Sequence, residues 1–212
     1  MIRTANRVFR GGDWLIRHPA YWNHNVAYYD WIKNSTMACK DILDVGCGDG
    51  SLVRYLDDGK RTLVGIDGDE ACIKRALNES GSNNAQFIYN RFEAYNFEKK
   101  FDAVVFVASI HHMDMTVALN KAKSILKPDG MILIVGLAKP SNFFDWVVEA
   151  FRVIPCTIVS KIRHMQSSED NHISVSYHFQ EMNEIRTTAD ILLPSSKIKY
   201  GLFYRYLLWW KK

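Results

Sequence analysis

The chain has 212 residues, a length that suits a single domain, 1–212, with some embellishment. Hydrophobic residues make up 48% and charged residues 24%, a balance that excludes a disordered chain. The net charge of +4 is too small to indicate a nucleic-acid partner by itself. No apolar run reaches the ~20 residues of a membrane span, and the arginine-rich start lacks the apolar run of a secretory signal, so we expect a cytoplasmic protein.

The potential metal ligands are scattered along the chain. The four cysteines lack Cys-x-x-Cys spacing, which argues against a zinc site and against a disulfide framework. The histidines and carboxylates show no ligand spacing such as His-x-x-x-His. We therefore expect no metal site.

In chain order, an aromatic-rich segment over 14–37 reads as helical. Short apolar runs then alternate with helical patterns, which is typical of a parallel sheet with crossover helices. The predicted strands are 41–45, 62–66, 85–89, 101–107 and 131–136. The predicted helices lie near 50–57, 69–78 and 115–126.

A long insertion over 139–193 follows the fifth predicted strand. It contains an amphipathic stretch at 143–162 and a polar segment at 166–176, and two further strands joined near Gly201 are predicted after it. Insertions of this length are more often functional than passive, so we expect this one to cover a substrate.

The most informative motif is the sequence Asp41-Ile-Leu-Asp-Val-Gly-Cys-Gly-Asp-Gly50. A predicted buried strand runs into three alternating glycines, which let a ligand approach the backbone closely. A dinucleotide fingerprint needs its third glycine at the position of Ser51, and no Lys-Ser/Thr pair indicates a phosphate-binding P-loop. Asp67 ends the next strand about twenty residues later, where a carboxylate accepts hydrogen bonds from ribose hydroxyls.

The glycine loop and Asp67 resemble the motifs of class I S-adenosylmethionine-dependent methyltransferases. The resemblance continues in Phe101–Met113, similar to the fourth-strand motif, and in Ile125-Leu-Lys-Pro-Asp-Gly-Met131, similar to the turn before the fifth strand. The flanking parts resemble small bacterial-type methyltransferases, of the type 11/12-like kind. The resemblance implies an α/β fold with a Rossmann-like, doubly wound sheet of seven strands, mostly parallel with the last strand antiparallel, and helices on both faces.

The same resemblance implies which residues bind S-adenosyl-L-methionine. The glycines Gly46, Gly48 and Gly50 are expected along its methionine and ribose, Asp44 at the loop or the amino group, and Asp67 at the ribose. Further cofactor-binding residues are expected at Cys47, Gly68, Arg91, Phe92, Ala108 and His112. Arg91 stands where relatives often have an acid, so the adenine contact is left open between the backbone near Phe92, Glu93 and Asn90.

The acceptor side is expected at the histidines after the fourth strand and at the N-terminal segment. His111 is the candidate base toward the acceptor, since a histidine pKa lies near working pH. The resemblance implies that an N-terminal helix caps the cofactor pocket, and His24 and Tyr28 are its candidate catalytic residues. Simple packing is the alternative for each of these side chains.

The implied reaction is in-line displacement of the cofactor's methyl group by a small organic acceptor, expected to be apolar or aromatic because the insertion is apolar. Three alternatives remain. The basic ends would suit RNA methylation, a protein that has lost catalysis would act as a cofactor-binding regulator, and the stretch at 143–162 would suit peripheral contact with a membrane. A monomer and a homodimer both fit the sequence.

Overall fold

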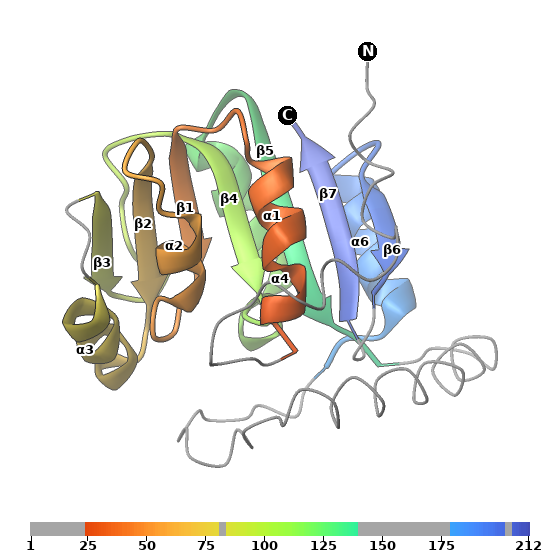
Figure 1. The fold of residues 1–212 in the computed structure, drawn as a ribbon. Helices are drawn as coiled ribbons and strands as arrows, with labels where there is room; N and C mark the ends of the chain where they lie inside the picture. The colour runs from red at the N-terminus through yellow and green to blue at the C-terminus, as the bar shows by residue number, and fades with distance from the viewer. Residues whose placement is uncertain (1–23, 81–83, 140–178, 202–204) are drawn as a thin grey trace.

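A seven-stranded sheet in the order β3-β2-β1-β4-β5-β7-β6 forms the centre of the protein (Figure 1). The computed structural model describes residues 24–80, 84–139, 179–201 and 205–212. The strands are β1 (Asp41–Val45), β2 (Thr62–Asp67), β3 (Ala85–Tyr89), β4 (Phe101–Val107), β5 (Leu126–Leu137), β6 (Lys197–Tyr200) and β7 (Arg205–Lys211). The pairs from β3 to β5 are parallel, whereas β7 is antiparallel to both β5 and β6. The predicted fold class is confirmed.

The predicted strands coincide with observed ones, and β5 shows the largest difference. It begins at Leu126, five residues before the predicted start at Met131. The pairing with β4 shifts register here, since Phe101 lies opposite Leu126 and Ala103 lies opposite Met131. The predicted turn is therefore present as an irregularity inside the strand, with Asp129 at a positive φ of 61°.

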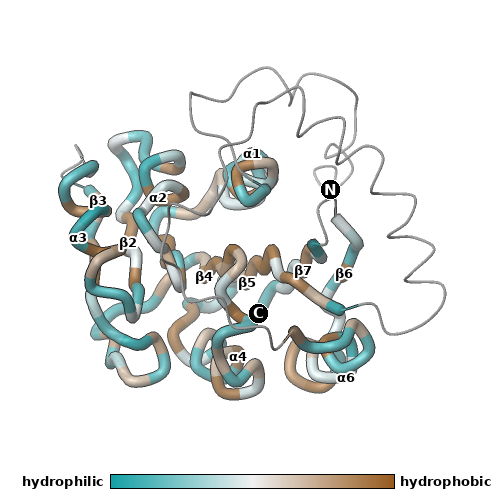
Figure 2. Tube along the Cα trace, turned by 90° about the horizontal axis from the view of Figure 1, so that it is seen from below, coloured by the Kyte–Doolittle hydropathy of each residue, from teal (hydrophilic) through white to brown (hydrophobic). Residues whose placement is uncertain are grey.

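Helices cover both faces of this sheet (Figure 2). One core contains buried residues of α1 (Tyr29–Ser35), α2 (Ser51–Leu56) and α3 (Glu70–Glu79). The core on the other face contains those of α4 (Met115–Ile125) and α6 (Met182–Leu192). Because the central strands are buried on both faces, they read as continuous apolar runs such as that of β4.

The helix starts follow from capping side chains. The Asp69 carboxylate accepts hydrogen bonds from the backbone N–H groups of Ala71 and Cys72, and so begins α3 directly after β2. Asp114 caps α4 in the same way by accepting from the N–H of Val117. These caps place both helix starts beside the carboxyl ends of the strands.

Part of the predicted insertion over 139–193 belongs to the central fold. Its last segment forms α6, whose residues Met182, Ile185 and Ala189 are buried in the core shared with α4. This part therefore supports the sheet and is not a cover, because its apolar face is already buried. The N–H of Lys139 donates to the carbonyl of Gln180 at 3.0 Å, so these two described residues lie side by side.

The rest of the insertion, 140–178, lies outside the described residues, as do the amphipathic stretch and the polar segment within it. Of the predicted N-terminal helices over 14–37, residues 14–23 also lie outside. The described remainder forms the 3-10 turn η2 (Val26–Tyr28) and α1. None of the helices in the described ranges is long and apolar enough to cross a membrane.

Candidate active site

A cavity of about 440 Å³ opens at the carboxyl ends of β1, β2 and β4, where doubly wound sheets hold their ligands. Its volume lies in the range of ~300–1,000 Å³ that is usual for small-molecule sites. Its walls come from the glycine loop, the end of β2, the segments after β3 and β4, and the N-terminal segment. The predicted cofactor-binding residues that line it are Asp44, Gly46, Cys47, Gly48, Asp67, Gly68, Arg91, Phe92, Ala108 and His112.

Two glycines of the loop serve different purposes. Gly48 has a φ of +55°, and a Cβ placed on it would meet nothing within 4 Å, so its open side belongs to the cavity it lines. Gly50 has a φ of +78°, and a Cβ there would lie 2.6 Å from the ring of Phe87. Gly50 was predicted along the cofactor, but it does not line the cavity. Its lack of a side chain instead lets the start of α2 lie close to β3.

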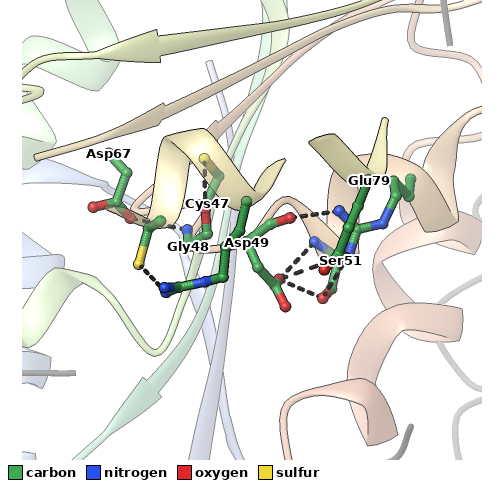
Figure 3. A network of polar contacts seen from close by, with 9 residues as sticks. Cys47, Gly48, Asp49, Ser51, Asp67 and Glu79 are labelled. Atoms are coloured by element: carbon green, nitrogen blue, oxygen red, sulfur yellow. Dashed lines mark hydrogen bonds and ion pairs between the residues drawn. The ribbon is translucent and has the colours of Figure 1, made fainter. Parts of the chain in front are cut away.

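The Asp67 carboxylate ties the glycine loop to the end of β2 (Figure 3). It accepts a hydrogen bond from the N–H of Gly48 at 2.9 Å with one oxygen and from the N–H of Asp69 at 2.8 Å with the other. The next loop residue, Asp49, accepts from the N–H of Ser51 at the start of α2. The loop therefore keeps its shape through carboxylates that also face the cavity.

Asp44 is the buried carboxylate of the site, with only 3% of its surface exposed. Its Oδ1 has no hydrogen-bond partner among the described residues. Burial, and then the nearby carboxylates of Asp67 and Asp49, raise the pKa of Asp44 to about 8. A cationic group in the cavity would both satisfy this oxygen and stabilise its charged form.

The segment after β3 forms one end of the cavity through Asn90, Arg91, Phe92 and Glu93. The ring of Phe92 is buried and meets Phe106 edge-on, with centroids 5.8 Å apart. The Lys121 ammonium donates to the carbonyl of Glu93 at 2.9 Å and so holds the segment in place. All three sources of an adenine contact that the sequence left open therefore lie at this end.

The two histidines after β4 have different surroundings. His112 lines the cavity, whereas His111 does not, and its ring lies 5.2 Å from that of Phe179. Burial, then His112, then Arg205 lower the pKa of His111 to about 4. Its Nδ1 is buried without a hydrogen-bond partner in the part of the chain that the structure describes.

The N-terminal segment reaches the cavity through Asn25 and Tyr29. The predicted residues, His24 and Tyr28, each lie one position earlier and do not line it. Tyr28 is buried instead against Gly201, where an added Cβ would lie 2.5 Å from the tyrosine hydroxyl. The segment therefore lines part of the cavity, but with the side chains next to the predicted ones.

The methyltransferase-domain family model matches residues 42–130, which include the glycine loop, Asp67 and the segments after β3 and β4. An uncharacterised methyltransferase of Mycobacterium tuberculosis (strain H37Rv) is 24% identical over 201 residues, which cover 90% of this chain and 96% of the relative. Residues 42–130 therefore form a methyltransferase domain, and these matches support a class I S-adenosylmethionine-dependent methyltransferase. The ubiquinone biosynthesis O-methyltransferase of Bartonella tribocorum is 28% identical over 117 residues, which are 53% of this chain and 45% of that enzyme.

Solved structures share the fold of this methyltransferase at low sequence identity. The plantazolicin methyltransferase BpumL, in complex with a desmethyl plantazolicin analogue and S-adenosylhomocysteine (SAH), has a TM-score of 0.62 at 18% identity, covering 88% of this chain and 82% of that one. The N-methyltransferase NodS from Bradyrhizobium japonicum, in complex with SAH, has a TM-score of 0.61 at 14% identity, covering 93% and 90%.

The residues present fit S-adenosylmethionine. The unsatisfied oxygen of Asp44 offers an acceptor for the amino group, and the open side of Gly48 leaves room along the loop. Asp67 stands at the end of β2, where a ribose would lie. In the described part of the methyltransferase, no three potential metal ligands come together.

Several lining residues were not predicted. They are Tyr29, Asp49, Ser51, Leu52, Ile66, Asp69, Cys72, Arg75, Val107, Ser109 and Met113. Arg205 was missed as well, although it donates a hydrogen bond to Asn25 and its charge helps to lower the pKa of His24 and of His111. The available signal was a charge at the start of the terminal strand, directly before the five apolar or aromatic residues 206–210.

Proposed function

We propose that this methyltransferase transfers the methyl group of S-adenosylmethionine to a small organic acceptor. The proposal is carried by the cavity in which the unsatisfied carboxylate of Asp44 faces the open glycine loop. In this assignment Asp44 binds the amino group of the cofactor and Asp67 its ribose. The residues Asn90, Arg91, Phe92 and Glu93 hold the adenine.

The protein's part in the reaction is to hold both reactants and to exclude water. When bound, S-adenosylmethionine supplies a methyl group on a sulfonium, which suits in-line displacement by a nucleophile of the acceptor. Ala108, with its positive φ of 51°, and Ser109, which donates to the carbonyl of Val45, fix the backbone between the cofactor cavity and the histidines. This rigid turn supports placing the acceptor beside β4.

His111, His24 and Tyr28 are proposed as acceptor-side residues. With its pKa held near 4, His111 is neutral at pH 7 and is a weak proton acceptor. We therefore propose that His111 orients the acceptor through a hydrogen bond. Burial and then Arg205 lower the pKa of His24, so we propose that this histidine is also neutral when it meets the acceptor. Residues 140–178 are proposed to cover the acceptor.

The proposal is tested by incubating the enzyme with S-adenosylmethionine labelled in its methyl group and an extract containing small molecules, RNA and proteins. We expect label in the small-molecule fraction, and a loss of that label in the Gly48→Val variant. Label that disappears on ribonuclease treatment would favour the RNA alternative. Cofactor binding without label in any fraction would favour the non-catalytic regulator.

A further inference from the structure

Arg205 places a positive charge next to the cofactor cavity. It is the first residue of β7 and lies opposite Leu137 at the carboxyl end of β5. Although charged, it is only 9% exposed. Its Nη2 donates to the side-chain oxygen of Asn25 at 2.7 Å, and Asn25 itself lines the cavity. The guanidinium is therefore one side chain away from the cofactor site.

Two imidazoles share this environment with Arg205. The guanidinium contributes to the lowered pKa of both His24 and His111, which shows that its charge acts on both rings. Burial lowers the pKa of Arg205 itself to about 10, so it remains charged at neutral pH. A charged guanidinium thus acts on two imidazoles that are neutral at pH 7, and its hydrogen-bond partner Asn25 lines the cavity.

Such an environment favours an anion. The guanidinium presents five N–H donors in a planar fork that matches a carboxylate, and its attraction for an anion is stronger in a buried site than in water. The imidazole of His111, with its buried and unsatisfied Nδ1, adds a neutral polar group beside the charge. Because both imidazoles are neutral at pH 7, the electrostatic attraction for the anion comes from the Arg205 guanidinium.

We propose that the acceptor is an organic acid and that Arg205 binds its carboxylate. This inference rests on the proposed function and narrows its acceptor to one chemical class. Arg205 is a specificity-determining residue in this account, and Asn25 positions it relative to the cofactor cavity. The competing account is a structural one, in which Arg205 only ties η2 to the start of β7.

The test compares acids with their uncharged amides on the SAH-saturated protein. Calorimetry at pH 7.5 measures the affinities of benzoate and benzamide, phenylacetate and phenylacetamide, and indole-3-acetate and its amide. At least one acid should bind about 10-fold or more tightly than its amide, because hydrogen bonds between charged groups are stronger than those to a neutral amide. A series in which no acid exceeds its amide overturns the inference.

Three variants assign the preference to Arg205. Arg205→Gln should bring the affinity ratio of acid to amide close to one, and Arg205→Lys should retain part of it because the charge remains. Lys199→Gln is the matched control, since it removes an exposed positive charge from the neighbouring strand β6 and should leave the ratio unchanged. A ratio that survives in Arg205→Gln contradicts the inference.

The histidines give a second, independent readout. Binding of an acid should raise the pKa of His111 in a nuclear magnetic resonance titration, because an anion offsets the Arg205 charge. An unchanged His111 pKa in the acid complex would contradict the placement beside Arg205. The wild-type measurements decide the matter even if Arg205→Gln does not fold. SAH binding is measured first, and its absence would contradict the proposed function, whereas SAH binding without a preference for acids contradicts this inference alone.

Discussion

The Asp67 carboxylate accepts a hydrogen bond from the backbone N–H of Gly48 at 2.9 Å, and this bond joins the loop after β1 to the end of β2. The same side chain accepts from the N–H of Asp69, which caps α3. One carboxylate therefore holds two walls of the cavity in addition to its proposed contact with the ribose. Its removal should affect the cofactor site far more than the rest of the fold.

Replacing Asp67 with Ala should weaken SAH binding about 10-fold or more, because hydrogen bonds to a charged group contribute about 1.5–3 kcal/mol. Isothermal titration calorimetry measures the dissociation constant directly. Glu70→Ala is the matched control, since Glu70 is an exposed carboxylate three residues away that pairs with Lys74. Equal dissociation constants in Asp67→Ala and the control would show that Asp67 does not contact the cofactor.

Gly48 and Gly59 provide a second matched pair. Both have a positive φ, of 55° and 72°, and a Cβ on either would meet nothing within 4 Å. Alanine at each should therefore destabilise the protein by a similar amount, about 1–2 kcal/mol in denaturant unfolding. Only Gly48→Ala should also weaken SAH binding, because only Gly48 lines the cavity. Equal SAH affinity in both variants would place the cofactor elsewhere.

Asp44 should make the stability of the cofactor-free protein fall as pH rises. Its pKa is about 8 in the folded state and ~3.9 in an unfolded chain, so between these values the folded state binds more protons. The contribution of one such group is a decrease of up to about 1.4 kcal/mol per pH unit. Urea unfolding between pH 5 and 8 should show a less negative slope in Asp44→Asn than in the wild type. Parallel slopes would show that Asp44 is ionised in the free protein.

The same carboxylate should release a proton when the cofactor binds. At pH 7 Asp44 is mostly protonated in the free protein, and a cationic amino group beside it would favour the ionised form. Calorimetric titrations with SAH in two buffers of different ionisation enthalpy should therefore reveal up to one proton released, and none from this source in Asp44→Asn. Identical proton release in both proteins would argue against the assigned contact.

Most of the sheet could be predicted because its strands are marked by local signals. The apolar runs of β1 and β4 are buried on both faces, and glycines or aspartates mark where the following turns and helices begin. Residues that line the cavity here could be predicted for the same reason, since Asp44 and Asp67 lie in the last residues of β1 and β2 and Gly48 follows β1 closely. The packing of α6 in the core was not predicted, because its apolar residues are buried together with those of α4 and no local pattern encodes that contact.

The acceptor side was harder to predict because it is assembled from distant parts of the chain. Arg205 contacts Asn25 across 180 residues, and no local pattern encodes that contact. Local sequence patterns also did not decide which side chains of the N-terminal segment reach the cavity, since Asn25 and Tyr29 line it whereas His24 and Tyr28 do not.

The central claim is that the cavity beside Asp44, Gly48 and Asp67 binds S-adenosylmethionine and not a dinucleotide. Titration calorimetry of the wild-type protein with S-adenosylmethionine, SAH and NAD tests it most directly. Both sulfur compounds should bind at one site per chain, and NAD should give no binding heat. Tight NAD binding with no response to either sulfur compound would contradict the account.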